Sequence, residues 1–540
     1  MLSEIFTKFN RPKIYLLAAN VFLVFFLILL ANLNILPIKD LPDFLFFTLI
    51  YLAFALYRPG WSFLFFIGTI ALENINLAPQ GIGLAVRPYQ FIGGLTILAV
   101  LIKLAAGRLG FKLPKFGWPD LAVLVFAAAG FLSAVFALDR GVSFKQSIVA
   151  ASFAALYFLV RLFIPDIEDL KRVIPFFFSS SAIVVLYSLW QNIRFLSGAA
   201  SFEVMAGRPN ATFTEADWYG IYLVLLLAII YSIIYYISNV SKEGESLIFN
   251  FQFSIFNKFS ITKSQNLKIA ICGLLVATYV ALILTVSRSA WLGALFVTII
   301  FLFAILTQLK INPKNWQWKN TIRVKIPIII SILFSLLLVF GFHLTNFQLF
   351  NRVQSTGTGL QKITVACTQN VALPEKIESV SELAQYGCKH IDLEDIQTEK
   401  AEGNFVTEIF RTDPNVNIRG VIYQKSWAEI KTHPILGIGW GNIGSILGTD
   451  ESGHSLNSSN IFLETWLGAG IIGFFAIVLI FLNGPAKGVK FFANGASDDE
   501  KTLGLFLILG SFALLIPNLF NAGIFLGIAW VFFALVNITI

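Results

Sequence analysis

Long apolar stretches recur from Ile14 to the C-terminus, and they constrain the fold of this chain more than any other feature. A helix needs about 20 mainly apolar residues to cross the hydrocarbon core of a membrane. Residues 21–30 and 223–230 are apolar on every side, whereas the strands of a membrane barrel would alternate apolar and polar residues. Since 57% of the 540 residues are hydrophobic and 13% are charged, a water-soluble core could not bury this surface. The sequence therefore predicts an all-α fold, a polytopic transmembrane helical bundle.

The chain contains about 12–14 such stretches, and the second and third are short enough to form one broken hairpin. They lie near residues 14–33, 44–57, 61–72, 88–105, 121–138, 147–164, 174–190, 218–237, 269–286, 290–309, 326–343, 461–482, 503–515 and 524–538. One polar interval is much longer than the others. It divides the chain into a predicted N-terminal transmembrane bundle (1–343), a large extracytoplasmic loop (344–459) and C-terminal transmembrane helices (460–540).

Lysine and arginine gather in the intervals that share one side of the membrane with the N-terminus. These residues are Lys8, Arg11, Lys13, Lys103, Arg108, Lys112, Lys115, Lys258, Lys263, Lys268, Lys310, Lys314, Lys319, Arg323 and Lys325. Because basic loops stay in the cytoplasm, we expect a cytoplasmic N-terminus and a 344–459 loop outside the membrane. The formal net charge of +8 is then a sign of topology, and no nucleic-acid partner is expected.

Two arginines lie at predicted helix ends on the outer side. A charged group near the hydrocarbon needs a partner, a cavity or a route to the interface. Arg288 lies where two spans meet almost without a loop, and Arg208 precedes the span that starts at Trp218. Arg288 could instead snorkel to the interface beside Trp291, but the positive-inside bias disfavours an isolated outer arginine. Arg208, taken alone, is equally compatible with an ordinary solvated loop residue.

The end of the large loop, from Arg419 to Asn460, holds further candidates. Apolar residues at Val421, Ile422, Trp427 and Ile430 predict a short helix lying on the membrane and ending before Pro434. Gly439, Gly441 and Gly444 match the dinucleotide-binding spacing, but no strand is predicted before them, so we interpret the match as chance.

His454 lies a few residues before the span that Asn460 opens. A neutral imidazole there could accept a proton from a substrate hydroxyl near pH 7, although a surface histidine in a Ser/Asn-rich loop is the simpler interpretation. Two guanidiniums on the same side match a diphosphate, because each offers a rigid fork of donors and stays charged. No zinc-type motif or outer Asp-x-Asp occurs, so no metal and no cofactor are expected.

Cys367 and Cys388 both lie in the outer loop, where a disulfide is chemically allowed. We favour this bond because the polar insert from about Thr356 to Phe410 needs a cross-link to hold a shape. The role of the insert is left open.

These features together resemble the O-antigen ligase and Wzy-type polymerase superfamily of membrane glycosyltransferases. The resemblance covers most of the chain and rests on Val86-Arg87-Pro88-Tyr89-Gln90, on Thr285-Val286-Ser287-Arg288-Ser289-Ala290-Trp291, and on the runs 433–439, 460–464 and 470–473. It implies that Arg208 and Arg288 hold a donor diphosphate and that His454 activates the acceptor hydroxyl. Two positions depart from the family pattern: Ser459 stands directly before Asn460, where a histidine is common, and Asp217 replaces an asparagine.

The resulting hypothesis is an inverting, metal-independent transfer of an undecaprenyl-diphosphate-linked glycan to an acceptor hydroxyl at the outer face of the bacterial inner membrane. His454 and Arg288 are the expected catalytic residues, and Arg208, Arg288, Arg419 and Asn460 the expected substrate-binding residues. The acceptor, whether a glycolipid such as the lipopolysaccharide core, a glycan or a protein, is left open.

A transporter or flippase for an amphiphile is the alternative, since it would also need many spans and cavity arginines. It predicts inverted repeats and broken helices with charges at mid-span. The sequence contains no clear internal repeat, and its candidate arginines fall at helix ends.

Overall fold

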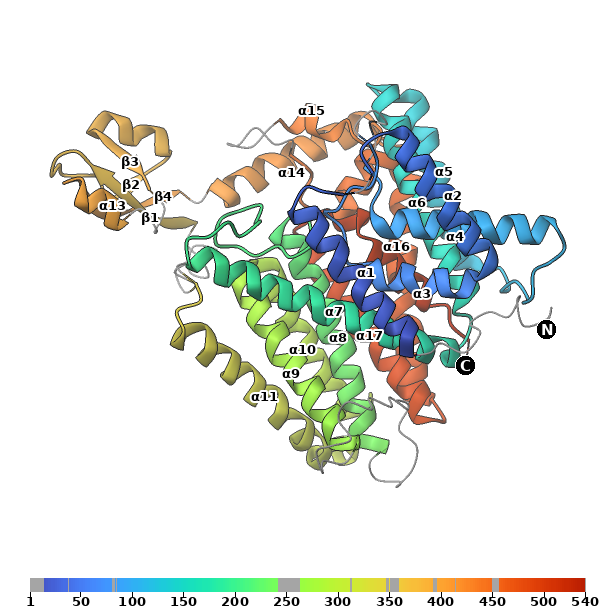
Figure 1. The fold of residues 1–540 in the computed structure, drawn as a ribbon. Helices are drawn as coiled ribbons and strands as arrows, with labels where there is room; N and C mark the ends of the chain where they lie inside the picture. The colour runs from blue at the N-terminus through green and yellow to red at the C-terminus, as the bar shows by residue number, and fades with distance from the viewer. Residues whose placement is uncertain are drawn as a thin grey trace.

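The computed structural model of the chain describes residues 14–36, 38–79, 83, 85–240, 263–310, 313–345, 349, 359–391, 396–412, 414–448 and 456–539. These residues are mainly helical (Figure 1). Within them, nine helices are long and apolar enough to cross a membrane, and three shorter helices are also apolar. The prediction of a polytopic helical membrane protein is therefore confirmed.

The N-terminal part forms a run of helices that coincides with the predicted spans. They are α1 (Ile14–Asn32), α2 (Leu41–Tyr57), α3 (Pro59–Thr69), α4 (Pro88–Ala105), α5 (Trp118–Phe136), α6 (Arg140–Phe163), α7 (Ile167–Leu196), α8 (Ala216–Val240), α9 (Lys263–Leu284), α10 (Arg288–Thr307) and α11 (Trp318–Gly341). Only Arg58 separates α2 from α3, as expected for a broken hairpin, because Pro59 cannot continue the first helix.

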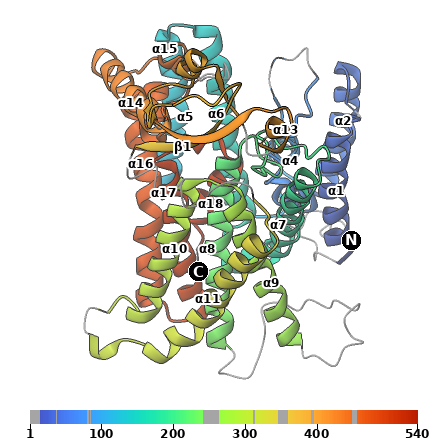
Figure 2. The ribbon, with the colours of Figure 1, turned by 90° about the vertical axis from the view of Figure 1, so that its left-hand side faces the viewer.

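The C-terminal part adds α16 (Ile461–Asn494), α17 (Asp498–Asn518), a short turn η7 (Gly523–Phe525) and α18 (Gly527–Leu535). In Figure 2, α16, α17, α10 and α8 run side by side along the bundle, with α14, α15 and β1 at one end. At the opposite end the C-terminal Thr539 pairs with Asp166 before α7. We call the end that carries α14 and the α7–α8 and α9–α10 connections the site end.

The insert in the large loop contains a small sheet that the sequence did not predict. Its strands are β1 (Leu360–Cys367), β2 (Lys376–Ile377), β3 (Cys388–His390) and β4 (Phe405–Thr412), in the order β2-β4-β1-β3, accompanied by η5 (Val380–Tyr386) and α13 (Ile396–Ala401). Antiparallel pairing of β1 with β4 places Cys367 opposite Phe405. The predicted Cys367–Cys388 disulfide is confirmed and joins β1 to β3. Figure 1 shows this module set apart from the bundle beyond α14.

The predicted loop helix is α14 (Pro414–Thr432), which is longer than expected and ends before Pro434. Ile422 and Ile430 are buried against the short helix α15 (Ile443–Leu447) and the start of α16, whereas Val421 and Trp427 are exposed. The helix thus rests on the bundle through one apolar edge.

A glycine-rich loop fixes α14 to the bundle. Gly437, Gly439 and Gly441 adopt positive φ, which a residue without a side chain adopts at little cost. Between them, Trp440 inserts into the bundle and is 1% exposed. A Cβ at Gly468 of α16 would come within 2.2 Å of its ring, and one at Gly130 of α5 within 2.8 Å of its indole nitrogen. The glycines therefore serve to seat a tryptophan. The element directly before them is α14 and not a strand, which agrees with the interpretation of the motif as chance.

Replacing Trp440 with Ala should lower the thermal unfolding temperature of the purified protein, because emptying a buried aromatic site costs about 3–5 kcal/mol. Trp427→Ala is the matched control, since Trp427 is 48% exposed and its loss should have little effect. Thermal unfolding in detergent would measure both. Equal melting of the two variants would contradict the proposed seating role of Trp440.

Candidate functional site

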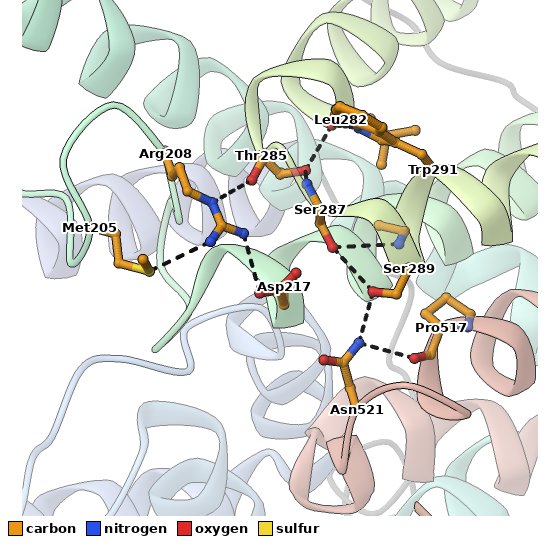
Figure 3. Close-up of polar contacts among 11 residues, drawn as sticks. Met205, Arg208, Asp217, Leu282, Thr285, Ser287, Ser289, Trp291, Pro517 and Asn521 are labelled. Carbon is orange, nitrogen blue, oxygen red and sulfur yellow. Dashed lines mark hydrogen bonds and ion pairs between the residues drawn. The ribbon is translucent and has the colours of Figure 1, made fainter. Parts of the chain in front are cut away.

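Arg208 is held inside the site end by three different partners. It lies in the connection between α7 and α8 and is 8% exposed. Its Nε donates to the Thr285 carbonyl oxygen at 2.9 Å, and its Nη2 lies 3.2 Å from Asp217 Oδ2 (Figure 3). Among the described residues, its Nη1 contacts the sulfur of Met205, at 3.6 Å, which is a weak acceptor. Arg208 is therefore a buried, positioned cation rather than a solvated loop residue.

Thr285 belongs to the short turn between α9 and α10, which also carries Arg288. Ser287 caps α10 by accepting from the Ala290 amide at 3.4 Å, so Arg288 is the first residue of the helix. Arg288 is half-buried. The Trp291 indole donates across the turn to the Leu282 carbonyl oxygen at 2.9 Å, which holds the turn closed.

Helices α8 and α10 begin side by side. A Cβ at Gly220 of α8 would lie 2.6 Å from the Cβ of Ala290 in α10, so only a glycine permits this approach. Because the N-terminal amides of a helix carry partial positive charge, two adjacent helix starts reinforce the arginines as an anion-attracting surface.

The connection after α17 completes the site end. Asn521 donates to Ser289 Oγ at 2.9 Å and to the Pro517 carbonyl oxygen at 3.0 Å (Figure 3). Asn460, which caps α16, donates to the Leu519 carbonyl oxygen at 3.1 Å. This short connection links the α9–α10 turn with the start of α16.

Arg419 of α14 reaches the same connection from the loop side. Its guanidinium carbon lies 5.8 Å from the ring centroid of Phe520, in a cation–π contact. It also interacts electrostatically with Asp217, the carboxylate that pairs with Arg208. The structure thus brings Arg208, the Arg288 turn, Arg419 and Asn460 to one end of the bundle. His454, the expected base, lies outside the described residues.

The sequence analysis missed the role of Glu73, a buried acid in the connection between α3 and α4. Arg87 Nε lies 2.9 Å from Glu73 Oε2, the Tyr89 hydroxyl donates to the same oxygen at 2.9 Å, and the Gly527 amide donates to Oε1 at 2.9 Å. Burial raises the pKa of the Glu73 carboxyl, and the charge of Arg87 opposes this shift. The available signal was an isolated acid directly after an apolar span, followed by the Arg-Pro-Tyr run.

Glu73 ties two parts of the site together. The amides of Glu73 and Asn74 both donate to the Thr212 carbonyl oxygen, at 2.9 and 2.7 Å, in the same connection as Arg208. Through Gly527, its side chain also holds the segment that follows Asn521. Glu73 therefore supports the arginine loop through its backbone and the segment after α17 through its carboxylate.

Within the described ranges, no three His, Cys, Asp or Glu side chains are grouped so that they could hold a metal ion. Among the described residues, Arg208, Asp217 and Arg419 are charged side chains that interact with one another at the site end. This donor set suits an anionic ligand with several oxygens, such as a phosphate or diphosphate.

Comparison with known families gives a match over part of the chain. Residues 273–478 match the family model described as O-Antigen ligase, a segment that includes Arg288, Arg419 and Asn460 but not Arg208. This match supports the resemblance to the O-antigen ligase/Wzy superfamily. No curated protein and no solved structure matches the chain.

Glu73→Gln should lower the thermal unfolding temperature strongly, because removing one partner of a buried ion pair costs about 3–5 kcal/mol. The double variant Glu73→Gln/Arg87→Gln should recover part of this loss, since it leaves no uncompensated buried charge. Thermal unfolding of Glu73→Gln, Arg87→Gln and the double variant completes this double-mutant cycle. Additive losses would show that the two side chains do not support each other.

Proposed function

We propose that the protein is an inverting membrane glycosyltransferase. It transfers a glycan from undecaprenyl diphosphate to an acceptor hydroxyl at the outer face of the bacterial inner membrane. The positive-inside pattern supports this orientation, with the N-terminus in the cytoplasm and the 344–459 loop outside. The O-antigen ligase domain supports the reaction class.

The hydrogen bond from Arg208 Nε to the Thr285 carbonyl oxygen carries the proposal, because it joins two arginine-bearing segments that are 77 residues apart. Arg208 and Arg288 then approach one ligand from two connections at the site end. Two guanidiniums beside two helix starts match the two phosphates of the donor.

In the proposed reaction, the acceptor oxygen attacks the anomeric carbon and forms the new glycosidic bond. The bond from that carbon to the diphosphate oxygen breaks, and undecaprenyl diphosphate leaves with the bonding electrons. His454 accepts the proton of the acceptor hydroxyl. Arg208 and Arg288 stabilise the negative charge that grows on the leaving diphosphate, so the reaction needs no metal ion.

The other two predicted residues have positioning roles in this proposal. Arg419 joins α14 to the Phe520 connection and adds a third positive charge near the donor. Asn460 holds the start of α16 on Leu519 and so orders the segment that follows His454. The chemistry is therefore shared between the bundle and the end of the large loop.

Arg288→Ala should reduce glycan transfer at least about 100-fold, because the growing charge on the leaving group loses a fixed donor. Release of undecaprenyl diphosphate, measured in membranes of a deletion strain that carries each variant, reports the reaction. Arg140→Ala is the matched control, since Arg140 is exposed at the start of α6 and belongs to no part of the site. Normal transfer by Arg288→Ala would refute the assignment, and lipid translocation without release would favour a transporter.

His454→Gln should abolish transfer but leave pyrophosphate binding unchanged, because the base acts on the acceptor and not on the donor phosphates. Transfer assays and calorimetry with inorganic pyrophosphate separate the two effects. His433→Gln serves as the control, since His433 is exposed and pairs with Glu429 at the end of α14. Full transfer by His454→Gln would show that another group removes the proton.

A further inference from the structure

The ion pair between Arg208 and Asp217 occupies the edge of the guanidinium that a ligand would use. Nε is engaged by the Thr285 carbonyl oxygen, which leaves Nη1 and Nη2 as the edge that can bind a phosphate. Nη2 pairs with Asp217, and within the described part of the chain Nη1 contacts the Met205 sulfur. The strong acceptor on this edge is therefore a carboxylate supplied by the protein itself.

Asp217 and Met205 are also more exposed than Arg208, so they lie on the solvent side of its guanidinium. The side chain of Arg208 is 9% exposed, that of Asp217 is 32% exposed, and Met205 is 50% exposed. A ligand that approaches the Nη edge therefore meets the two residues bonded to it first. Met205 offers little resistance, because a thioether contact to a guanidinium is weak.

The position of Asp217 matches that of a bound anion. It lies in the first turn of α8, where the helix dipole favours negative charge, and it interacts with Arg419 as well as Arg208. An oxygen ligand bridging the α7–α8 connection and α14 would make these same interactions. A carboxylate, like a phosphate, presents two oxygens to a guanidinium.

We propose that Asp217 is an internal stand-in for a donor phosphate, which the diphosphate displaces from Arg208 when it binds. This inference rests on the proposed function. In the donor-free protein, Asp217 compensates the buried charge of Arg208 and keeps its guanidinium on Thr285. After transfer, the carboxylate returns to Arg208 and helps expel the spent undecaprenyl diphosphate. Asp217 is thus a residue that sets donor affinity and product release.

The test compares pyrophosphate binding by the full-length wild type and Asp217→Asn. The asparagine keeps the shape of the side chain and an acceptor oxygen for Arg208 but removes the competing charge. We expect Asp217→Asn to bind inorganic pyrophosphate roughly tenfold more tightly by calorimetry, because the ligand no longer has to displace an ion pair. Asp139→Asn is the matched control, since Asp139 caps α6 at the same end and should leave the affinity unchanged.

Turnover gives a second readout that a purely structural ion pair would not produce. In Asp217→Asn, both kcat and KM for the lipid-linked donor should fall, because substrate and product are held more tightly. A structural role would instead weaken binding when the pair is removed. If Asp217→Asn does not fold, Asp217→Ser is judged by the same criteria.

Arg208→Gln separates failure of this inference from failure of the proposed function. One outcome is that Arg208→Gln loses pyrophosphate binding while Asp217→Asn binds as tightly as the wild type or more weakly. This outcome would overturn the stand-in role of Asp217 but would still support the donor site at Arg208. Wild-type binding by Arg208→Gln would show that the donor phosphates bind elsewhere, and both proposals would fail.

Discussion

The buried carboxylate of Glu73 must be compensated within the bundle, and the groups that compensate it hold the site end together. Arg87 supplies the charge, while Tyr89 and the Gly527 amide supply hydrogen bonds. These partners come from the start of α4 and from the start of α18, and the backbone amides of Glu73 and Asn74 donate to the Thr212 carbonyl oxygen. A polar group without water or a partner is costly inside a membrane protein, so the three segments cannot separate cheaply. The arginine loop is therefore held by the backbone next to a buried ion pair.

The buried charge of Arg208 is also compensated, but by fewer partners than that of Glu73. Arg208 is buried, but one nitrogen of its outer edge has only a sulfur contact and the other has a partly exposed carboxylate. These partners compensate the buried charge of Arg208 in the folded protein, and the guanidinium still has donors that could turn to an anion. Arg161 differs from Arg208 in this respect, because its buried guanidinium bonds to Asp120 and to the carbonyl oxygens of Lys115 and Asn537.

The large loop divides into a small cross-linked module and a part that belongs to the site. The module is held by its own strands and by the Cys367–Cys388 disulfide. The second part, from α14 to the start of α16, is fixed by Trp440 between α5 and α16 and by Arg419 against Phe520. In the proposed function this part of the loop supplies the base, and proton transfer requires hydrogen-bond contact between the base and the acceptor.

The sequence by itself determined the helical membrane fold, the turn that carries Arg288 and the helix before Pro434, and it favoured the disulfide that the structure contains. Each of these depends on local composition, spacing or a chemical pairing within one segment, so each is visible along the chain. It could not give the sheet of the insert, whose short strands pair Leu360–Cys367 with Phe405–Thr412 across an intervening segment without a strong local pattern. Only the tertiary structure decided that Asp217 pairs with Arg208, that Glu73 supports the arginine loop and that Asn521 joins Ser289. The contacts of Glu73 and Asn521 connect residues far apart in sequence, because helix packing brings them to the same end of the bundle. The Arg208–Asp217 pair depends on how the connection before α8 folds.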